Sequence, residues 1–162
     1  MDEKLQREIF NHLQNKYIKN FVGVPDSTLK FFIDEGFIQK KIIIANREEE
    51  AIGIATGMIL SKSPTLVFMQ NAGFANSLST ITSLVQLYEI PMLFLIGWRG
   101  YLHNDAPEHK KIGKIQPKLL DSLDLENRIL TEKTWKKNCD WALSKIKKNK
   151  SVALIIRRDF LD

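Results

Sequence analysis

Apolar and polar positions along the chain follow two alternating patterns. Leu5, Ile9, Leu13 and Tyr17 recur at every fourth residue, which predicts an amphipathic helix at the start of the chain. Apolar spacing, together with cap and stop residues, predicts further helices over residues 26–36, 47–62, 75–89, 131–149 and near 116–123.

The segments between these helices are continuous apolar runs, as in "KKIIIA" and "PTLVFMQ". Continuous runs are typical of strands that are buried on both faces of a parallel sheet. Strands alternating with helices indicate the same architecture. We therefore expect an α/β fold: a single doubly wound domain, residues 1–162, with an open, mostly parallel sheet of about six strands. The expected strands cover residues 17–24, 40–45, 64–70, 90–97, 127–130 and 151–158.

Composition supports one folded domain, because 44% of the residues are apolar and 27% are charged. No apolar run approaches the ~20 residues of a membrane helix, and the first ten residues lack the layout of a signal peptide. Cys139 is the only cysteine, which excludes an internal disulfide. We expect a cytoplasmic protein. The lysine-rich stretch near the end is read as a solvated helix face, since no nucleic-acid-binding motif accompanies it.

Polar, glycine-rich segments follow each of the first four expected strands. Carboxyl ends of parallel strands share one edge of the sheet, and ligands bind outside that edge. We therefore expect the ligand site to be built from these four segments. They are "GVPDS" (23–27), "NREEEA" (46–51), "QNAGFANS" (70–77) and "GWRGYLHNDAPEH" (97–109).

Three consecutive glutamates open the helix expected at 47–62. With Asn46 as N-cap, Glu49 occupies the position from which a capping-box acid reaches back to the cap backbone. Any acid in this first turn is also stabilised by the helix dipole. Glu50 is expected to be solvated or paired. Glu48 lies nearest the strand end, and helix capping alone leaves open whether it is structural or catalytic.

The other polar segments also have two readings each. "QNAG" either caps a helix or presents two amides to a polar ligand. Arg99, which lies between glycines in "GWRG", forms either a surface ion pair or a bidentate contact with an anionic ligand. His103 and His109 are expected in a loop, and their spacing without a third ligand predicts no metal site. No P-loop, GxGxxG, GxSxG or HExxH motif is present.

Four motifs in order carry a resemblance to a known family over about residues 5–158. They are "FVGVPDSTLK", "REEEAIGIATG", "MQNAGFANS" with "TSLVQLYEIPMLFLIGWRG", and "DAPEHKKIGKI". The chain resembles the pyrimidine-binding (Pyr) domain of thiamine-diphosphate-dependent 2-oxoacid decarboxylases. Within that group it is similar to the phosphonopyruvate and sulfopyruvate decarboxylase family.

The resemblance implies a role for each matching residue. Glu48 matches the family's catalytic glutamate, whose carboxyl group hydrogen-bonds N1′ of the cofactor's aminopyrimidine and favours its imino form. The cofactor holds the electrons when carbon dioxide leaves. Implied contacts with thiamine diphosphate involve Glu48, Gln70, Asn71 and Gly73. Implied contacts with the substrate involve Asp26, Ser27, Asn71, Arg99 and His109.

One part of the family's site is missing from this sequence. The family binds the diphosphate and Mg²⁺ through a Gly-Asp-Gly segment, and no "GDG" occurs here. The resemblance therefore implies an alpha subunit that is active only with a partner. A beta subunit would carry the diphosphate- and Mg²⁺-binding domain in a hetero-oligomer, across an interface on the order of 2,000 Å² or more.

The motifs support two substrates. "GWRG" and the D-x-P-x-H pattern favour 3-phosphonopyruvate, converted to phosphonoacetaldehyde and carbon dioxide, as the first choice. The separate chain and "REEEA" favour 3-sulfopyruvate as the alternative. Ala75, Ala106 and Glu108 depart from the family pattern, which affects the expected loop contacts. A remote alternative is a non-catalytic Pyr-like binding module.

Overall fold

The structure is a computed structural model that describes residues 1–102 and 104–157. His103, one of the two histidines considered above, and Arg158, the last residue of the final expected strand, lie outside the described residues. The elements are α1 (Glu3–Lys16), β1 (Asn20–Gly23), η1 (Ser27–Leu29), α2 (Lys30–Ile38), β2 (Ile42–Ile44), α3 (Glu48–Leu60), β3 (Thr65–Gln70), α4 (Asn71–Asn76), α5 (Leu78–Thr80), η2 (Ile81–Gln86), β4 (Leu93–Trp98), α6 (Pro107–Ser122), β5 (Asn127–Ile129), α7 (Trp135–Ile146) and β6 (Val152–Arg157).

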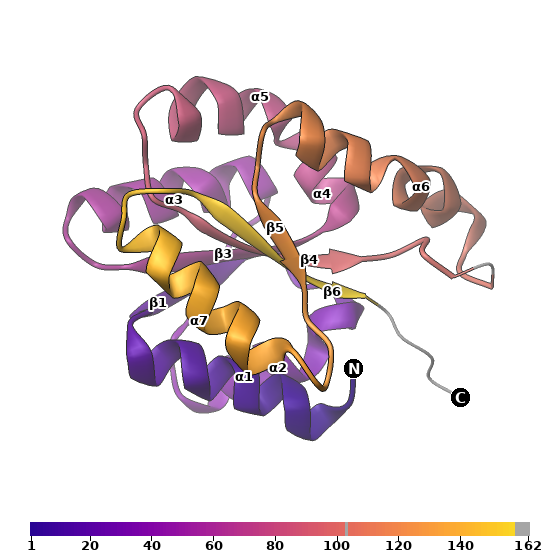
Figure 1. Cartoon of the computed structure of the whole chain (residues 1–162), viewed down its shortest axis with the longest axis horizontal. Helices are drawn as coiled ribbons and strands as arrows, with labels where there is room; N and C mark the ends of the chain where they lie inside the picture. The colour runs from indigo at the N-terminus through magenta and orange to yellow at the C-terminus, as the bar shows by residue number, and fades with distance from the viewer. Residues whose placement is uncertain (103, 158–162) are drawn as a thin grey trace.

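The strands form one six-stranded sheet in the order β2-β1-β3-β4-β6-β5. Every neighbouring pair is parallel, so all carboxyl ends lie at one edge (Figure 1). This arrangement confirms the predicted α/β class and open parallel sheet. The chain reaches β2 on one side of β1 and β3 on the other, which places the segments after β1, β2, β3 and β4 next to one another.

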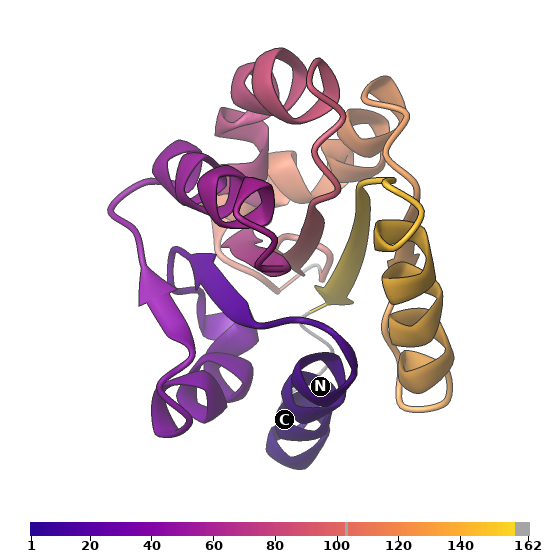
Figure 2. The ribbon, with the colours of Figure 1, turned by 90° about the vertical axis from the view of Figure 1, so that its left-hand side faces the viewer.

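Helices cover both faces of the sheet, and Figure 2 shows the two layers. One layer contains α1, α2 and α7, whose apolar side chains pack with Phe68 and Leu95 of the central strands. The other contains α3, α4, η2 and α6, which pack with Met69 and Ile96. Successive strand residues therefore enter opposite cores. This explains the continuous apolar runs of β3, β4 and β6. The expectation that the run "KKIIIA" is buried on both faces was wrong, because β2 is an edge strand in which Ile44 is 43% exposed.

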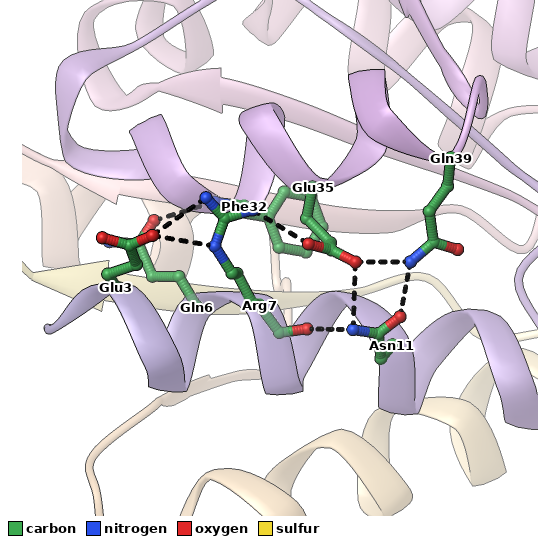
Figure 3. Close-up of polar contacts among 7 residues, drawn as sticks. All are labelled: Glu3, Gln6, Arg7, Asn11, Phe32, Glu35 and Gln39. Atoms are coloured by element: carbon green, nitrogen blue, oxygen red, sulfur yellow. Dashed lines mark hydrogen bonds and ion pairs between the residues drawn. The ribbon is translucent and has the colours of Figure 1, made fainter.

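A polar contact between α1 and α2 fixes the segment after β1 (Figure 3). The Gln6 side chain is only 3% exposed, and its amide donates to the Thr28 carbonyl oxygen over 3.0 Å. Its oxygen accepts from the Phe32 N–H over 3.1 Å. Gln6 thus satisfies backbone groups at the turn from η1 into α2. The turn carries Ser27, one of the predicted substrate contacts, at the carboxyl edge of the sheet.

The helix expected near 116–123 begins much earlier, at Pro107, and this prediction was wrong in its start. Proline suits the first helical turn, where its missing N–H leaves no hydrogen bond unmade. Gly113 and Gln116 are buried on the inner face, where larger apolar residues are usual. The sequence therefore lacked the apolar periodicity that marks a helix. One consequence is that His109 lies in the first turn of α6 and not in a loop.

The segment after β3 also differs from its prediction. A helix was expected from residue 75 to 89, but α4 begins at Asn71, directly after the strand. The helical path continues through α5 and ends in η2, a π-helical segment. Because the strand passes directly into the helix, Asn71 is a helical residue at the sheet edge.

Candidate active site

Predicted site residues gather at the carboxyl edge of the sheet, in the segments that follow β1, β2, β3 and β4. Asp26 and Ser27 follow β1, and Glu48 follows β2 at the start of α3. Gln70 ends β3, and Arg99 directly follows β4. These strands are neighbours in the sheet. The expected convergence at one edge is thus present in the fold.

The first turn of α3 differs in detail from the capping prediction. Arg47 is the N-cap and Glu48 the first helical residue. The Asn46 N–H donates to Glu50 Oε2 over 2.8 Å. Glu50, and not Glu49, therefore reaches back to the backbone before the helix. The prediction for Glu49 was wrong because the helix begins one residue later than expected.

The Glu48 side chain packs directly on Gly73 of α4. A Cβ atom on Gly73 would collide with Oε1, Cδ and Cγ of Glu48, so this contact requires glycine. Glu48 is half-buried, and its carboxylate accepts no hydrogen bond from the described part of the chain. A carboxylate in this setting is available to an external donor. The residues present therefore fit the aminopyrimidine group that the resemblance implies.

Asp26 also holds an oxygen without a hydrogen bond. It is 6% exposed, and the Gln70 amide donates to Oδ1 over 3.0 Å. Oδ2 is buried and accepts no hydrogen bond from a described residue. A Cβ atom on Gly97 would collide with this oxygen, so the glycine makes room for it. Oδ2 can accept a hydrogen bond from a ligand or from water.

Arg99 is held by a carboxylate that the sequence analysis did not single out. Its Nη2 donates to Asp105 Oδ1 over 2.7 Å, and its Nε lies 3.1 Å from Asp105 Oδ2. Asp105 also accepts from the Gly100 and Ala106 N–H groups over 2.7 and 2.8 Å. The guanidinium beside it and these N–H donors hold the pKa of Asp105 well below its usual range, against the opposing effect of burial. Asp105 in turn raises the pKa of Arg99.

Asn71 and Ser27 contact Arg99 from the segments that follow β3 and β1. The Asn71 amide donates to the Arg99 carbonyl over 3.0 Å, and its oxygen accepts from the Arg99 N–H over 3.2 Å. Asn71 is fully buried, so its side chain fixes the backbone after β4. Arg99 Nη1 donates to Ser27 Oγ over 3.0 Å. An open hollow of ≈ 310 Å³, lined in part by Asp26, Ser27 and Lys30, lies beside this contact.

His109 reaches the same region through its backbone. Gly100 has a φ of 74°, and a Cβ atom there would collide with the His109 carbonyl. The start of α6 therefore lies against the segment after β4, at the right of Figure 1. Trp98 Nε1 donates to the Gly113 carbonyl over 2.9 Å and ties α6 to the sheet edge.

Two residues at this edge were missed in the sequence analysis. Asp105 was visible as an acid six residues from Arg99, but loop spacing gives no sign of a bidentate ion pair. Arg157 ends β6 and pairs in register with Trp98 of β4. Its guanidinium lies 4.5 Å from the Tyr101 ring centroid. An arginine at a strand end is a usable signal, because that end lies at the ligand edge.

Within residues 1–102 and 104–157, no group of three or more histidine, cysteine, aspartate or glutamate residues could hold a metal ion. Over the same residues, no helix has the length and apolar character needed to cross a membrane.

The chain matches no family model. It is 37% identical to the sulfopyruvate decarboxylase subunit alpha of Methanocaldococcus jannaschii, over 72% of this chain and 70% of the relative. It is 41% identical to the protein of the same name from Methanothermobacter thermautotrophicus, over 59% of this chain and 68% of the relative. It is 29% identical to the phosphonopyruvate decarboxylase of Streptomyces viridochromogenes, over 72% of this chain but only 30% of that protein.

Similarity to a solved structure supports the fold. A 2-oxoglutarate:ferredoxin oxidoreductase from Magnetococcus marinus superposes with a TM-score of 0.71 over 97% of this chain. The two sequences are 13% identical, and the match covers 29% of the solved chain. The fold is therefore that of one part of a larger enzyme chain. The identity to the alpha subunits shows that the chain belongs to the thiamine-diphosphate-dependent decarboxylase family that includes the sulfopyruvate and phosphonopyruvate decarboxylases.

Proposed function

We propose that the chain is the alpha subunit of a sulfopyruvate decarboxylase, converting 3-sulfopyruvate to sulfoacetaldehyde and carbon dioxide. The motif-based first choice was 3-phosphonopyruvate. The relatives named as alpha subunits favour the alternative, since they share 37% and 41% identity and similar length with this chain. The phosphonopyruvate decarboxylase is less similar, at 29%.

The observation that carries the catalytic proposal is the contact between Glu48 and Gly73. It leaves a half-buried carboxylate without a hydrogen bond from the described residues, at the ligand edge of the sheet. Glu48 would hold a proton at a ring nitrogen of the aminopyrimidine, in the role that the family resemblance implies. When bound, thiamine diphosphate supplies the electron sink for decarboxylation. Gln70, Asn71 and Gly73 would shape the pocket around the ring.

The substrate would lie between Glu48 and the segment after β4. Arg99 and Ser27 would donate hydrogen bonds to the anionic tail, and His109 would approach from the start of α6. Asp26, whose Oδ2 lacks a hydrogen bond from the described residues, would accept one from the substrate or from a water molecule.

A beta subunit would complete the enzyme. It would carry the diphosphate anchor and the Mg²⁺ site, and the cofactor would lie across the contact between the two chains. The "subunit alpha" names of the relatives support a hetero-oligomer of this kind. The cytoplasmic location expected from the sequence belongs to the same proposal.

The adjacent glutamates provide a matched test of the catalytic role. In the enzyme assembled with its beta subunit, Glu48→Gln is expected to lower turnover at least about 10³-fold, because the proton contact is lost. Glu49→Gln, one residue away, is expected to stay within about twofold of the wild type. Size-exclusion chromatography verifies that both variants assemble. Wild-type turnover in Glu48→Gln would overturn the catalytic assignment.

The substrate is tested with the same assembly. Turnover of 3-sulfopyruvate and 3-phosphonopyruvate is measured with thiamine diphosphate and Mg²⁺ present. We expect kcat/KM to favour 3-sulfopyruvate by at least about tenfold. A preference for 3-phosphonopyruvate would restore the motif-based first choice. No turnover of either compound by the wild-type assembly would reject the decarboxylase proposal itself.

A further inference from the structure

The chain turns sharply directly after β4, in the segment that carries Arg99. Gly100 has a φ of 74°, which reverses the direction of the backbone. Gly113 of α6 lies against this turn, since a Cβ atom there would collide with the carbonyl oxygens of Arg99 and Gly100. The next residue, Tyr101, lies outside the core, and 44% of its surface is exposed. Its ring is therefore held only by contacts at the rim of the sheet.

Tyr101 contacts the ends of two neighbouring strands. Trp98 ends β4, Arg157 ends β6, and the two residues pair in register. Side chains of in-register residues on adjacent strands lie on the same face of a sheet. The Tyr101 ring centroid lies 5.1 Å from that of Trp98, in an edge-to-face arrangement. It lies 4.5 Å from the Arg157 guanidinium. The ring thus lies across both strand ends.

Both contacts are attractive, and both partners are fixed by the fold. Edge-to-face contact brings the positive edge of one ring to the negative face of the other. The guanidinium is attracted to the Tyr101 ring by the same distribution of charge. Trp98 donates from Nε1 to the Gly113 carbonyl over 2.9 Å, and Arg157 belongs to β6. Tyr101 therefore attaches an irregular segment to the rigid sheet.

The segment after Tyr101 delivers the acid that orients Arg99. Asp105 accepts from Nε and Nη2 of Arg99 and from the Gly100 N–H. The Asp105 N–H donates to the Leu102 carbonyl over 3.3 Å, so this turn begins one residue after Tyr101. A displacement of Tyr101 would move the turn and draw Asp105 away from the guanidinium.

We infer that Tyr101 is a positioning residue: held by Trp98 and Arg157, it fixes the turn that carries Asp105 and thereby the direction of the Arg99 guanidinium. The inference rests on the proposed decarboxylase function, in which Arg99 contacts the anionic tail of the substrate. Tyr101 acts through Arg99 and needs no contact with the substrate. Without its ring, a smaller fraction of the molecules holds Arg99 ready to bind, and the apparent affinity falls by that fraction.

Tyr101→Ala removes both ring contacts. In the assembled enzyme, we expect KM for 3-sulfopyruvate to rise about tenfold and kcat to change by less than about twofold, because substrate binding is weakened and the chemistry at Glu48 is not. Tyr101→Phe keeps the ring and is expected to restore KM to within about twofold of the wild type. An unchanged KM in Tyr101→Ala would overturn the inference, and so would a loss confined to kcat.

A second pair of variants tests the cation while the ring stays in place. Arg157→Met keeps the length of the side chain but removes its charge, and we expect KM to rise about threefold. Arg128→Met is the matched control, because the Arg128 guanidinium of β5 lies 4.3 Å from the ring centroid of Trp141 in α7. We expect no change in KM there. An equal rise in both variants would indicate a general loss of stability and contradict the inference.

Amide hydrogen exchange of the assembled protein tests the inference without turnover. The Gly100 and Ala106 N–H groups both donate to Asp105. Their exchange is expected to be about tenfold faster in Tyr101→Ala, because the segment opens locally more often, and unchanged in Arg128→Met. Unchanged exchange in Tyr101→Ala would overturn the inference. If the wild type turns over neither 2-oxoacid, the proposed function fails, while the exchange rates still decide the role of Tyr101.

Discussion

Two arginines of this chain lie against acidic side chains, but their surroundings differ. Arg99 binds Asp105 at the carboxyl edge of the sheet, where the acid is 3% exposed and also accepts two backbone N–H groups. Arg7 binds Glu35 between α1 and α2 over 2.9 Å, where the acid is 14% exposed. Figure 3 shows that the second pair is supported by side chains, including Asn11 and Gln39.

The two ion pairs are similar in chemistry but have different structural roles. The Arg7–Glu35 pair joins two helices whose contact is already formed by apolar packing. The Arg99–Asp105 pair also binds the backbone N–H groups of Gly100 and Ala106, in a segment without regular secondary structure. Removing the acid is therefore expected to destabilise the fold more at the sheet edge than between the two helices.

The largest expected difference concerns stability. Asp105→Ala leaves a shielded guanidinium and two backbone N–H groups without their acceptor, and we expect the free energy of unfolding to fall by about 3 kcal/mol. Glu35→Ala is expected to cost about 1 kcal/mol, because water reaches that site more readily. Urea denaturation of the two variants measures both values. Equal losses would show that the backbone contacts of Asp105 add nothing.

Two glycine substitutions compare the segment after β4 with a helix in the same way. Gly100→Ala introduces a Cβ that collides with the His109 carbonyl at a positive φ, and we expect a loss of about 2 kcal/mol. Gly53→Ala lies in α3 with open space around it, and we expect a gain of about 0.5–1 kcal/mol from helix propensity. Thermal melts compare the two. A neutral Gly100→Ala would mean that the loop is free to shift.

Acid titration tests the charges of both acids. The pKa values of Asp105 and Glu35 are both lowered in the folded chain. The largest cause is the hydrogen bond from Arg99 for Asp105 and the hydrogen bond from the Gln39 amide for Glu35. A lowered pKa contributes stability that is present above the unfolded value and is lost as the pH falls through the folded value. Between about pH 5 and pH 2, unfolding free energy should therefore decline less steeply in Asp105→Asn than in the wild type. Glu35→Gln should reduce this decline of the unfolding free energy less than Asp105→Asn does. A larger reduction in Glu35→Gln would contradict the expected difference between the two acids.

The smallest effect is expected at the rim of the helix contact. Glu3 accepts from Arg7 over 2.9 Å, but its side chain is 56% exposed. Glu3→Gln is expected to change the unfolding free energy by less than about 0.5 kcal/mol. A larger effect would indicate that the α1–α2 network depends on charge as strongly as the sheet edge does.

Features of the fold that depend on local sequence patterns were predicted correctly. Apolar runs such as "KKIIIA" predicted the strands, and the polar segments after them predicted the ligand edge. The prediction failed where the local pattern was weak: the inner face of α6 carries Gly113 before residue 116, so its first two turns were read as a loop. The acid that reaches back at the start of α3 was also misassigned, since a shift of one residue moved this contact from Glu49 to Glu50.

By itself, the sequence determined the α/β class, the parallel sheet and the segments that meet at one edge, because apolar runs and the alternation of strands with helices can be read along the chain. Only the tertiary structure decided which side chains pair within that edge. Arg99 meets Ser27 across 72 positions and Asn71 across 28, and Gly73 lies under Glu48. Such contacts depend on which strands are neighbours and how closely two backbones approach. No spacing along the chain specifies either.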